Sequence, residues 1–193
     1  MATLERGFKS WCERTAAAMR LELELAAHAP LPPQRLADHL GIKIIIPQDI
    51  PNLPSHVLHQ LTVVDPRGWS AASFEVNGVA TIIRNPSNSA GRQASDIMHE
   101  LSHVILNHEP SQLILSETTE IAMRSFNAAQ EDEANWLGWA LLLPRVALTH
   151  CARRRLDSKA IAAEYSVSET LVIFRQRVTG VELQHSRRRS VQN

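Results

Sequence analysis

The sequence has little cysteine, no net charge and no long apolar run, and each shortage excludes a class of protein. Two cysteines occur among 193 residues, Cys12 and Cys151, and their separation excludes a framework of disulfides. Lysine plus arginine and aspartate plus glutamate number 20 each, so the chain lacks the positive excess of a general nucleic-acid or anionic-membrane surface. No stretch approaches the roughly 18 apolar residues of a membrane-spanning helix.

The first 29 residues also lack the features of an export signal. Charged side chains recur throughout this stretch, so it contains no uninterrupted apolar segment of the signal-peptide type. Together with the low cysteine content, this pattern predicts a protein of the reducing cytoplasm. The apolar fraction of 44% and the charged fraction of 21% are typical of a folded domain with a substantial core.

The first part of the chain is predicted to be a helix followed by a short helix and a strand. Apolar side chains at spacings of three and four predict an N-terminal helix within residues 1–29. A second helix is expected over 34–40, with Gly41 directly after its last turn. The β-branched run at 42–46 then predicts a strand.

The next part has the signals of a small antiparallel or mixed sheet. Strands are expected at 61–64 and 71–76 because both segments are rich in residues that favour extended backbone. Asn77-Gly78 predicts a tight hairpin leading into a further strand over 79–83. These segments indicate an α+β fold.

The remainder is predicted to be mostly helical. One helix is expected over 90–107, a second over 127–143, and two or three shorter helices within 145–178. The sequence therefore predicts a single domain over 1–180, followed by a polar, basic tail over 181–193.

The segment His99-Glu100-Leu101-Ser102-His103 is the strongest functional signal in the sequence. Residues four apart project from one face of a helix, so His99 and His103 can bind one zinc ion through their imidazoles. Glu100 lies about 100° round the helix from His99. It can therefore flank the metal and accept a proton from a zinc-activated water.

A catalytic zinc ion needs a third protein ligand and an open position for water. The helix expected over 127–143 offers Glu131, Asp132 and Glu133, about thirty residues after His103. If this helix packs against the helix expected over 90–107, a carboxylate near its start can reach the metal. The same ligands also accept manganese, iron or cobalt, so the sequence does not fix the metal.

Two segments together resemble the ImmA/IrrE family of metallopeptidases: HELSHVILNH at 99–108 and EDEANWLGWALLLP at 131–144. The resemblance covers about residues 30–180. It implies a zincin-like minimal metallopeptidase, in which a small antiparallel or mixed sheet precedes a helical bundle that carries the His-Glu-x-x-His helix.

The resemblance also implies roles for individual residues. His99 and His103 would be zinc ligands, and Glu100 would be the general base. Glu133 is the preferred third ligand. Glu131 is the alternative, because it is two positions away and would point to a different face of the helix.

Members of this family cut helix-turn-helix repressors and so release transcription in response to damage or stress. The resemblance therefore implies a zinc-dependent endopeptidase that acts on a regulatory protein. We expect this regulator to be a separate chain, because the sequence begins almost at the catalytic part. Neither a membrane nor a nucleic acid is an expected partner.

Two other functions remain open. The first is a DNA-binding regulator with a metallopeptidase-like fold, because residues 157–178 resemble a helix-turn-helix and Arg187 to Arg189 are basic. Glu169 heads the second helix of that segment and would face phosphates, which favours a structural role. The second is a metal-dependent binding partner that cuts no peptide.

The residue that would stabilise an oxyanion is not identified by its spacing. The candidates are His56, His59, His150 and Tyr165, the single tyrosine. The helical pattern around Tyr165 favours a packing role for that side chain.

Overall fold

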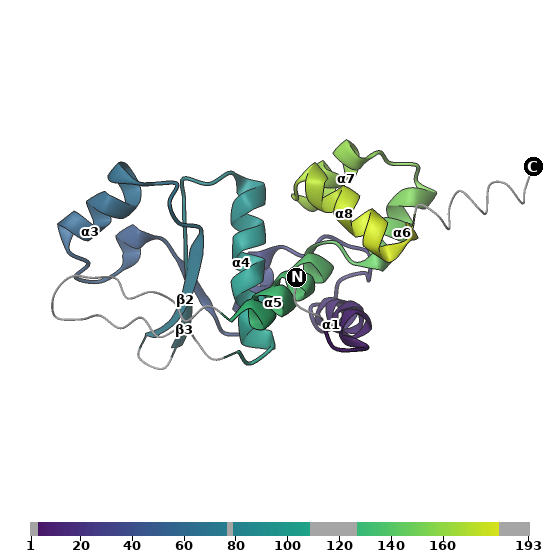
Figure 1. The fold of residues 1–193 in the computed structure, drawn as a ribbon, viewed down its shortest axis with the longest axis horizontal. Helices are drawn as coiled ribbons and strands as arrows, with labels where there is room; N and C mark the ends of the chain where they lie inside the picture. Colours follow the sequence, from purple (N-terminus) through teal and green to yellow (C-terminus); the bar gives the residue numbers. More distant parts are fainter. Residues whose placement is uncertain (1–3, 77–78, 109–126, 182–193) are drawn as a thin grey trace, which may run out of the picture.

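The fold combines a small three-stranded sheet with helices around it, and the computed structural model describes residues 4–76, 79–108 and 127–181 (Figure 1). The elements are α1 (Phe8–Glu22), α2 (Pro33–His39), β1 (Lys43–Ile45), the 3-10 turn η1 (Pro47–Asp49), α3 (Ser55–His59), the π-helical turn η2 (Gln60–Val64), β2 (Ala71–Val76), β3 (Val79–Arg84), α4 (Ala90–Ile105), α5 (Ala128–Leu142), α6 (Arg145–Arg153), α7 (Ser158–Tyr165) and α8 (Glu169–Thr179). The expected α+β class is confirmed. The tail expected over 181–193 lies outside the described residues except for Val181, which is buried and belongs to the core.

The sheet is mixed and has the strand order β1-β3-β2. β1 runs parallel to β3, and β2 runs antiparallel to it. The pairing of Val76 with Val79 confirms the expected hairpin, whose turn residues, 77 and 78, lie outside the described part. The central strand β3 is rich in β-branched residues and buries Ile82 completely.

The strand expected at 61–64 is wrong, because this segment is helical and continues α3. The hydroxyl of Thr62 donates a hydrogen bond to the Leu58 carbonyl at 2.7 Å, closing the helical turn. Val63 and Val64 are 61% and 58% exposed, so no sheet face buries them. Their preference for extended backbone is overridden because the segment gains no strand partner.

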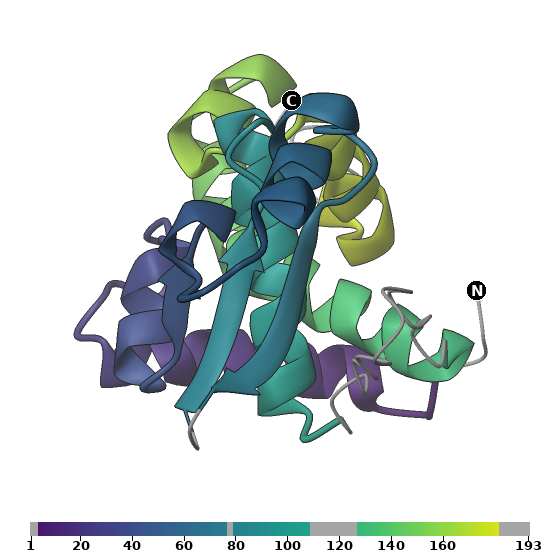
Figure 2. The ribbon, with the colours of Figure 1, turned by 90° about the vertical axis from the view of Figure 1, so that its left-hand side faces the viewer.

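Helix α4 lies at the centre of the fold, between the sheet and α5 (Figures 1 and 2). Ser89 caps its start, since its side chain accepts a hydrogen bond from the Arg92 backbone N–H. Met98 and Leu101 of α4 are fully buried, as is Leu137 of α5. This packing brings the start of α5 alongside the second half of α4.

Two buried arginines hold the other end of α5. Arg20 of α1 donates a hydrogen bond to the Leu141 carbonyl at 2.8 Å, and Arg175 of α8 donates to the Leu143 carbonyl at 3.0 Å. The last carbonyls of a helix have no intrahelical partner, so these guanidinium groups satisfy them. α5 is thereby fixed to both the N-terminal and the C-terminal helices. Among the described helices, none is long and apolar enough to cross a membrane.

Candidate metal centre

Three side chains from α4 and α5 converge on one point. His99 and His103 lie one turn apart on α4, and their Nε2 atoms are 3.0 Å apart. Glu131, in the first turn of α5, places Oε2 3.1 Å from Nε2 of His99 and Oε1 3.6 Å from Nε2 of His103. Within the part of the chain that the structure describes, this is the one group of three such side chains able to hold a metal ion.

The spacing of these ligand atoms fits a single zinc ion. A tetrahedral zinc ion with ligands at about 2.0–2.1 Å separates neighbouring ligand atoms by about 3.4 Å. The observed separations of 3.0, 3.1 and 3.6 Å lie on both sides of that value. Burial and the neighbouring His99 lower the pKa of His103 to about 4. This imidazole is therefore neutral at neutral pH and has a lone pair available for a metal.

The third member of the cluster is Glu131, the alternative, and not Glu133, which the resemblance favoured. The cause is the rotation of α5 against α4. Gly138 lies where the helices cross. A Cβ atom there would be 3.4 Å from the Met98 carbonyl oxygen and 3.5 Å from the backbone nitrogen of His99. Residues seven apart share a helix face, so Glu131 lies on the face of Gly138 and points at α4. Glu133 is about 140° away from that face.

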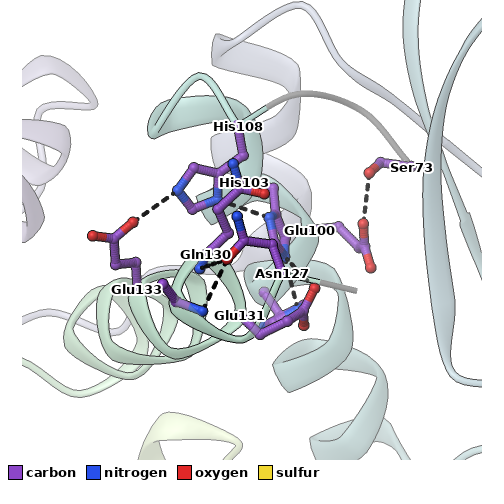
Figure 3. A network of polar contacts seen from close by, with 10 residues as sticks. Ser73, Glu100, His103, His108, Asn127, Gln130, Glu131 and Glu133 are labelled. Atoms are coloured by element: carbon purple, nitrogen blue, oxygen red, sulfur yellow. Dashed lines mark hydrogen bonds and ion pairs between the residues drawn. The ribbon is translucent and has the colours of Figure 1, made fainter. Parts of the chain in front are cut away.

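Glu133 contacts a different histidine. Its Oε2 lies 3.1 Å from Nε2 of His108, which follows the end of α4. Nδ1 of His108 in turn lies 2.9 Å from Nδ1 of His103 (Figure 3). Glu133 is thus connected to the cluster through the imidazole of His108 rather than directly.

Glu100, the predicted general base, is 2% exposed and lies on the side of α4 that faces the sheet (Figure 3). Ser73 of β2 donates a hydrogen bond to Oε2 of Glu100 at 2.6 Å. This contact orients the carboxylate beside the cluster without making it a member of it. Ser73 was not among the residues predicted from the sequence. The sequence feature that could have indicated Ser73 is the alternation of side chains along the strand. It places this polar residue on the same face as buried Ala71, where its partner on β3 is buried Ile82.

The candidates for oxyanion stabilisation are not brought to the cluster. Tyr165 is buried in α7 and donates its hydroxyl to the His28 carbonyl at 2.6 Å, so its role is in packing. His150 of α6 stacks on the His28 ring, with 3.8 Å between the ring centroids. His56 and His59 belong to α3, which lies across the β2–β3 hairpin from α4 (Figure 1).

The helix-turn-helix-like segment consists of α7, a turn and α8. Ser166 has φ 53° at this turn. Arg175 is buried and donates to Leu143 and to the carboxylate of Glu13, so it is not available to phosphates. This use of the arginine favours a structural role for the segment over nucleic-acid binding.

The chain is similar to known proteins in sequence and in fold. The M78 peptidase family described as the IrrE N-terminal-like domain matches residues 37–177. No curated protein matches the chain. Among solved structures, a Mycobacterium tuberculosis transcriptional regulator has a similar fold, with a TM-score of 0.50 and 14% sequence identity. That similarity covers 87% of this chain and 50% of the other, so this chain spans about half the length of the regulator.

The family match includes the His-Glu-x-x-His helix, the sheet before it and the helix that supplies Glu131. It extends over most of the sequence. The chain therefore belongs to the ImmA/IrrE family of metallopeptidases.

Proposed function

We propose that this protein is a zinc-dependent endopeptidase in which His99, His103 and Glu131 hold the metal and Glu100 is the general base. The observation that carries the proposal is the convergence of two imidazole nitrogens and one carboxylate beside a buried glutamate. A site with three protein ligands leaves a fourth position open, which is typical of catalytic rather than structural zinc.

The chemistry assigns a proton-transfer role to Glu100. A bound zinc ion would supply Lewis acidity and lower the pKa of water near it. Glu100 accepts one proton from the water that attacks the peptide carbonyl carbon, and it delivers that proton to the departing amine nitrogen. One C–O bond forms and the C–N bond breaks, so the products are a carboxyl group and an amine. Ser73 keeps the carboxylate of Glu100 pointed at this position.

The position of β2 suggests how a substrate chain could bind. Among the described residues β2 pairs on one side, with β3, and it carries Ser73, the residue that contacts Glu100. An extended peptide can add to a sheet edge through backbone hydrogen bonds. A peptide on this edge would run past Glu100 and bring its carbonyl groups close to the cluster.

For the substrate we propose a regulatory protein of the helix-turn-helix repressor type on a separate chain, cut in the cytoplasm in response to stress. The support is family membership, since ImmA/IrrE peptidases resemble this chain throughout the site. This part of the proposal is an inference by analogy and is independent of the metal chemistry.

The test compares the zinc-loaded protein with its Glu100→Gln variant in an extract of the cells that carry its gene. New protein N-termini are identified by mass spectrometry. We expect wild-type protein to generate specific new N-termini and Glu100→Gln to generate none while still binding zinc. Glu164→Gln, which alters an exposed ion pair with Arg154, is the matched control and should cut like wild type. Equal cleavage by Glu100→Gln or by metal-free protein would contradict the proposal.

A further inference from the structure

A chain of hydrogen-bonding groups leads from the cluster to Glu133. Nδ1 of His103 is 2.9 Å from Nδ1 of His108, and Nε2 of His108 is 3.1 Å from Oε2 of Glu133 (Figure 3). The His108 side chain is 8% exposed. The contact between His103, 14% exposed, and His108 is therefore largely shielded from water, whereas Glu133 at the other end is 28% exposed.

The end of α4 places His108 back against His103. Asn107 adopts the left-handed conformation, with φ 53°. Its N–H donates to the Val104 carbonyl at 3.0 Å, and the His108 N–H donates to the His103 carbonyl at 3.0 Å. This pair of hydrogen bonds is the Schellman motif, in which asparagine is a favoured alternative to glycine. A continued helix would instead place His108 about 140° away from His103.

The chemistry of the imidazoles permits one arrangement of protons along this chain. If His103 binds a metal through Nε2, its single proton is on Nδ1 and is donated to His108. Nδ1 of His108 is then the acceptor, so the proton of His108 is on Nε2 and is donated to Glu133. Every donor meets an acceptor, and the chain ends on a group that is acceptor-only when ionised.

We propose that His108 and Glu133 are positioning residues that hold His103 in its metal-binding tautomer and orientation. The inference rests on the proposed function, because it requires Nε2 of His103 to be a metal ligand. Hydrogen bonds from a metal-bound histidine to outer groups commonly raise metal affinity. The other histidine has no such support among the described residues, since Nδ1 of His99 is buried without a hydrogen-bond partner.

The test measures zinc affinity of the full chain by competition with a chromophoric chelator, using two substitutions of His108 that separate hydrogen bonding from packing. His108→Phe keeps a ring of similar size but offers no acceptor, and we expect zinc binding to weaken about 10–100-fold. His108→Asn is smaller, but its side-chain oxygen can accept the hydrogen bond of His103, and it should recover most of that loss. A packing role predicts the reverse order, with Phe close to wild type and Asn weaker.

A second pair of variants tests the other end of the chain. Glu133→Leu should weaken zinc binding in the same direction as His108→Phe. The double variant should be no weaker than His108→Phe alone, because both substitutions interrupt one chain. The matched control is His39→Phe, which removes a His–Glu contact of 2.9 Å to Glu22 away from the cluster and should leave zinc affinity unchanged.

The outcomes separate this inference from the proposed function. Wild-type affinity in His108→Phe and Glu133→Leu, or a fully additive double variant, overturns the positioning role while the metal site stands. Failure of the wild-type chain to bind zinc overturns the metal site and the inference with it. Thermal unfolding of the metal-free proteins establishes that each variant is folded. If His108→Phe does not fold, Glu133→Leu alone tests the inference.

Discussion

At the scale of single residues, the guanidinium of Arg20 shows how a charge is accommodated inside this protein. It is fully buried, and its partners are the carbonyl oxygens of Ala16, Ala29 and Leu141 at 2.8–3.0 Å. Burial lowers the pKa of Arg20 to about 10, so the group remains charged at neutral pH. The side chain thus joins α1, the segment after it and the end of α5.

We expect Arg20→Met to destabilise the protein because it leaves buried carbonyl groups without donors. Each such group costs about 1–3 kcal/mol, so the free energy of unfolding should fall by at least that amount. Urea unfolding followed by circular dichroism measures the difference. Arg14→Met, at an exposed position of the same helix, should change the free energy of unfolding by less than about 0.5 kcal/mol. A similar stability for both variants would contradict this account of α5.

The residues of the site were predicted to different degrees. His99, Glu100 and His103 are local in sequence, and a helical period alone brings them together. The choice between Glu131 and Glu133 depends on how α5 is rotated against α4, which no local pattern specifies. Gly138 is the residue that could have indicated that rotation, because a glycine inside a helix often marks close approach of another backbone.

At the scale of elements, the crossing of α4 and α5 determines the geometry of the cluster. A leucine at Gly138 would have to occupy the space of Ser102 and the Met98 carbonyl. Overfilling of this kind costs about 1–3 kcal/mol and separates the packed backbones. Close contact between α4 and α5 at Gly138 therefore positions His99 and His103 on α4 relative to Glu131 on α5.

We expect Gly138→Leu to weaken zinc binding as well as stability, because separation of the helices moves Glu131 away from the two histidines. The matched variant is Gly138→Ala, whose methyl group would lie 3.3 Å from Ser102 Oγ and would require only a small shift of the Ser102 side chain. It should keep zinc affinity close to wild type. Titration of both variants with zinc in the presence of a chelator measures the effect. Equal affinity in Gly138→Leu and wild type would show that the crossing does not position the ligands.

The stacked rings of His28 and His150 give the contact between α6 and the segment after α1 a dependence on pH. Partial burial and the facing His28 lower the pKa of His150. Arg154 and Arg153 lower it further to a smaller extent, and Glu164 partly opposes the shift. The unfolded chain then takes up a proton at about pH 6.5, whereas the folded chain takes it up only at lower pH. The contribution of His150 to the free energy of unfolding is therefore fully present above about pH 6.5. It is lost as the pH falls from there through the lower pKa of the folded chain.

We expect the melting temperature to fall between pH 7.5 and pH 5.5, values that bracket the ordinary histidine pKa of about 6.5. The fall should be smaller in His150→Gln, which cannot take up the proton. His59→Gln, an equivalent change in α3, is the control and should retain the wild-type pH dependence. The same fall in wild type and His150→Gln would contradict the role of the stacked pair.

The elements themselves were largely predictable, and the exception has a physical reason. Helix α4 has strong hydrophobic periodicity, and both helices that carry the site begin at polar caps, Ser89 and Asn127, so their limits lie within two residues of those expected. Thr62, Val63 and Val64 favour extended backbone, but a strand needs a partner, and partners are determined by the whole fold. Local propensity therefore gave the wrong element at 61–64.

At the scale of the whole molecule, one buried core extends from Cys12 of α1 through the sheet and α4 to Val181. The site lies within this packing, between α4, α5 and the β2 edge, so its residues come from segments far apart in sequence. Ser73 and Glu131 could not be assigned before these segments were placed against one another. The family resemblance indicated a metallopeptidase. The packing of α5 against α4 determines that Glu131 rather than Glu133 lies beside the two histidines.

The ligand set is tested by the zinc content of purified wild type, Glu131→Ala and Glu133→Ala, measured by inductively coupled plasma mass spectrometry after gel filtration. Wild type should retain about one zinc ion per chain. Glu133→Ala should stay close to that value, because all three cluster side chains remain and only the smaller contribution of the outer hydrogen bonds is lost. Glu131→Ala should retain well below one, because two histidines alone hold zinc weakly. Loss of zinc from Glu133→Ala with retention in Glu131→Ala would contradict the ligand set, and a zinc-free wild-type protein would contradict the metal centre itself.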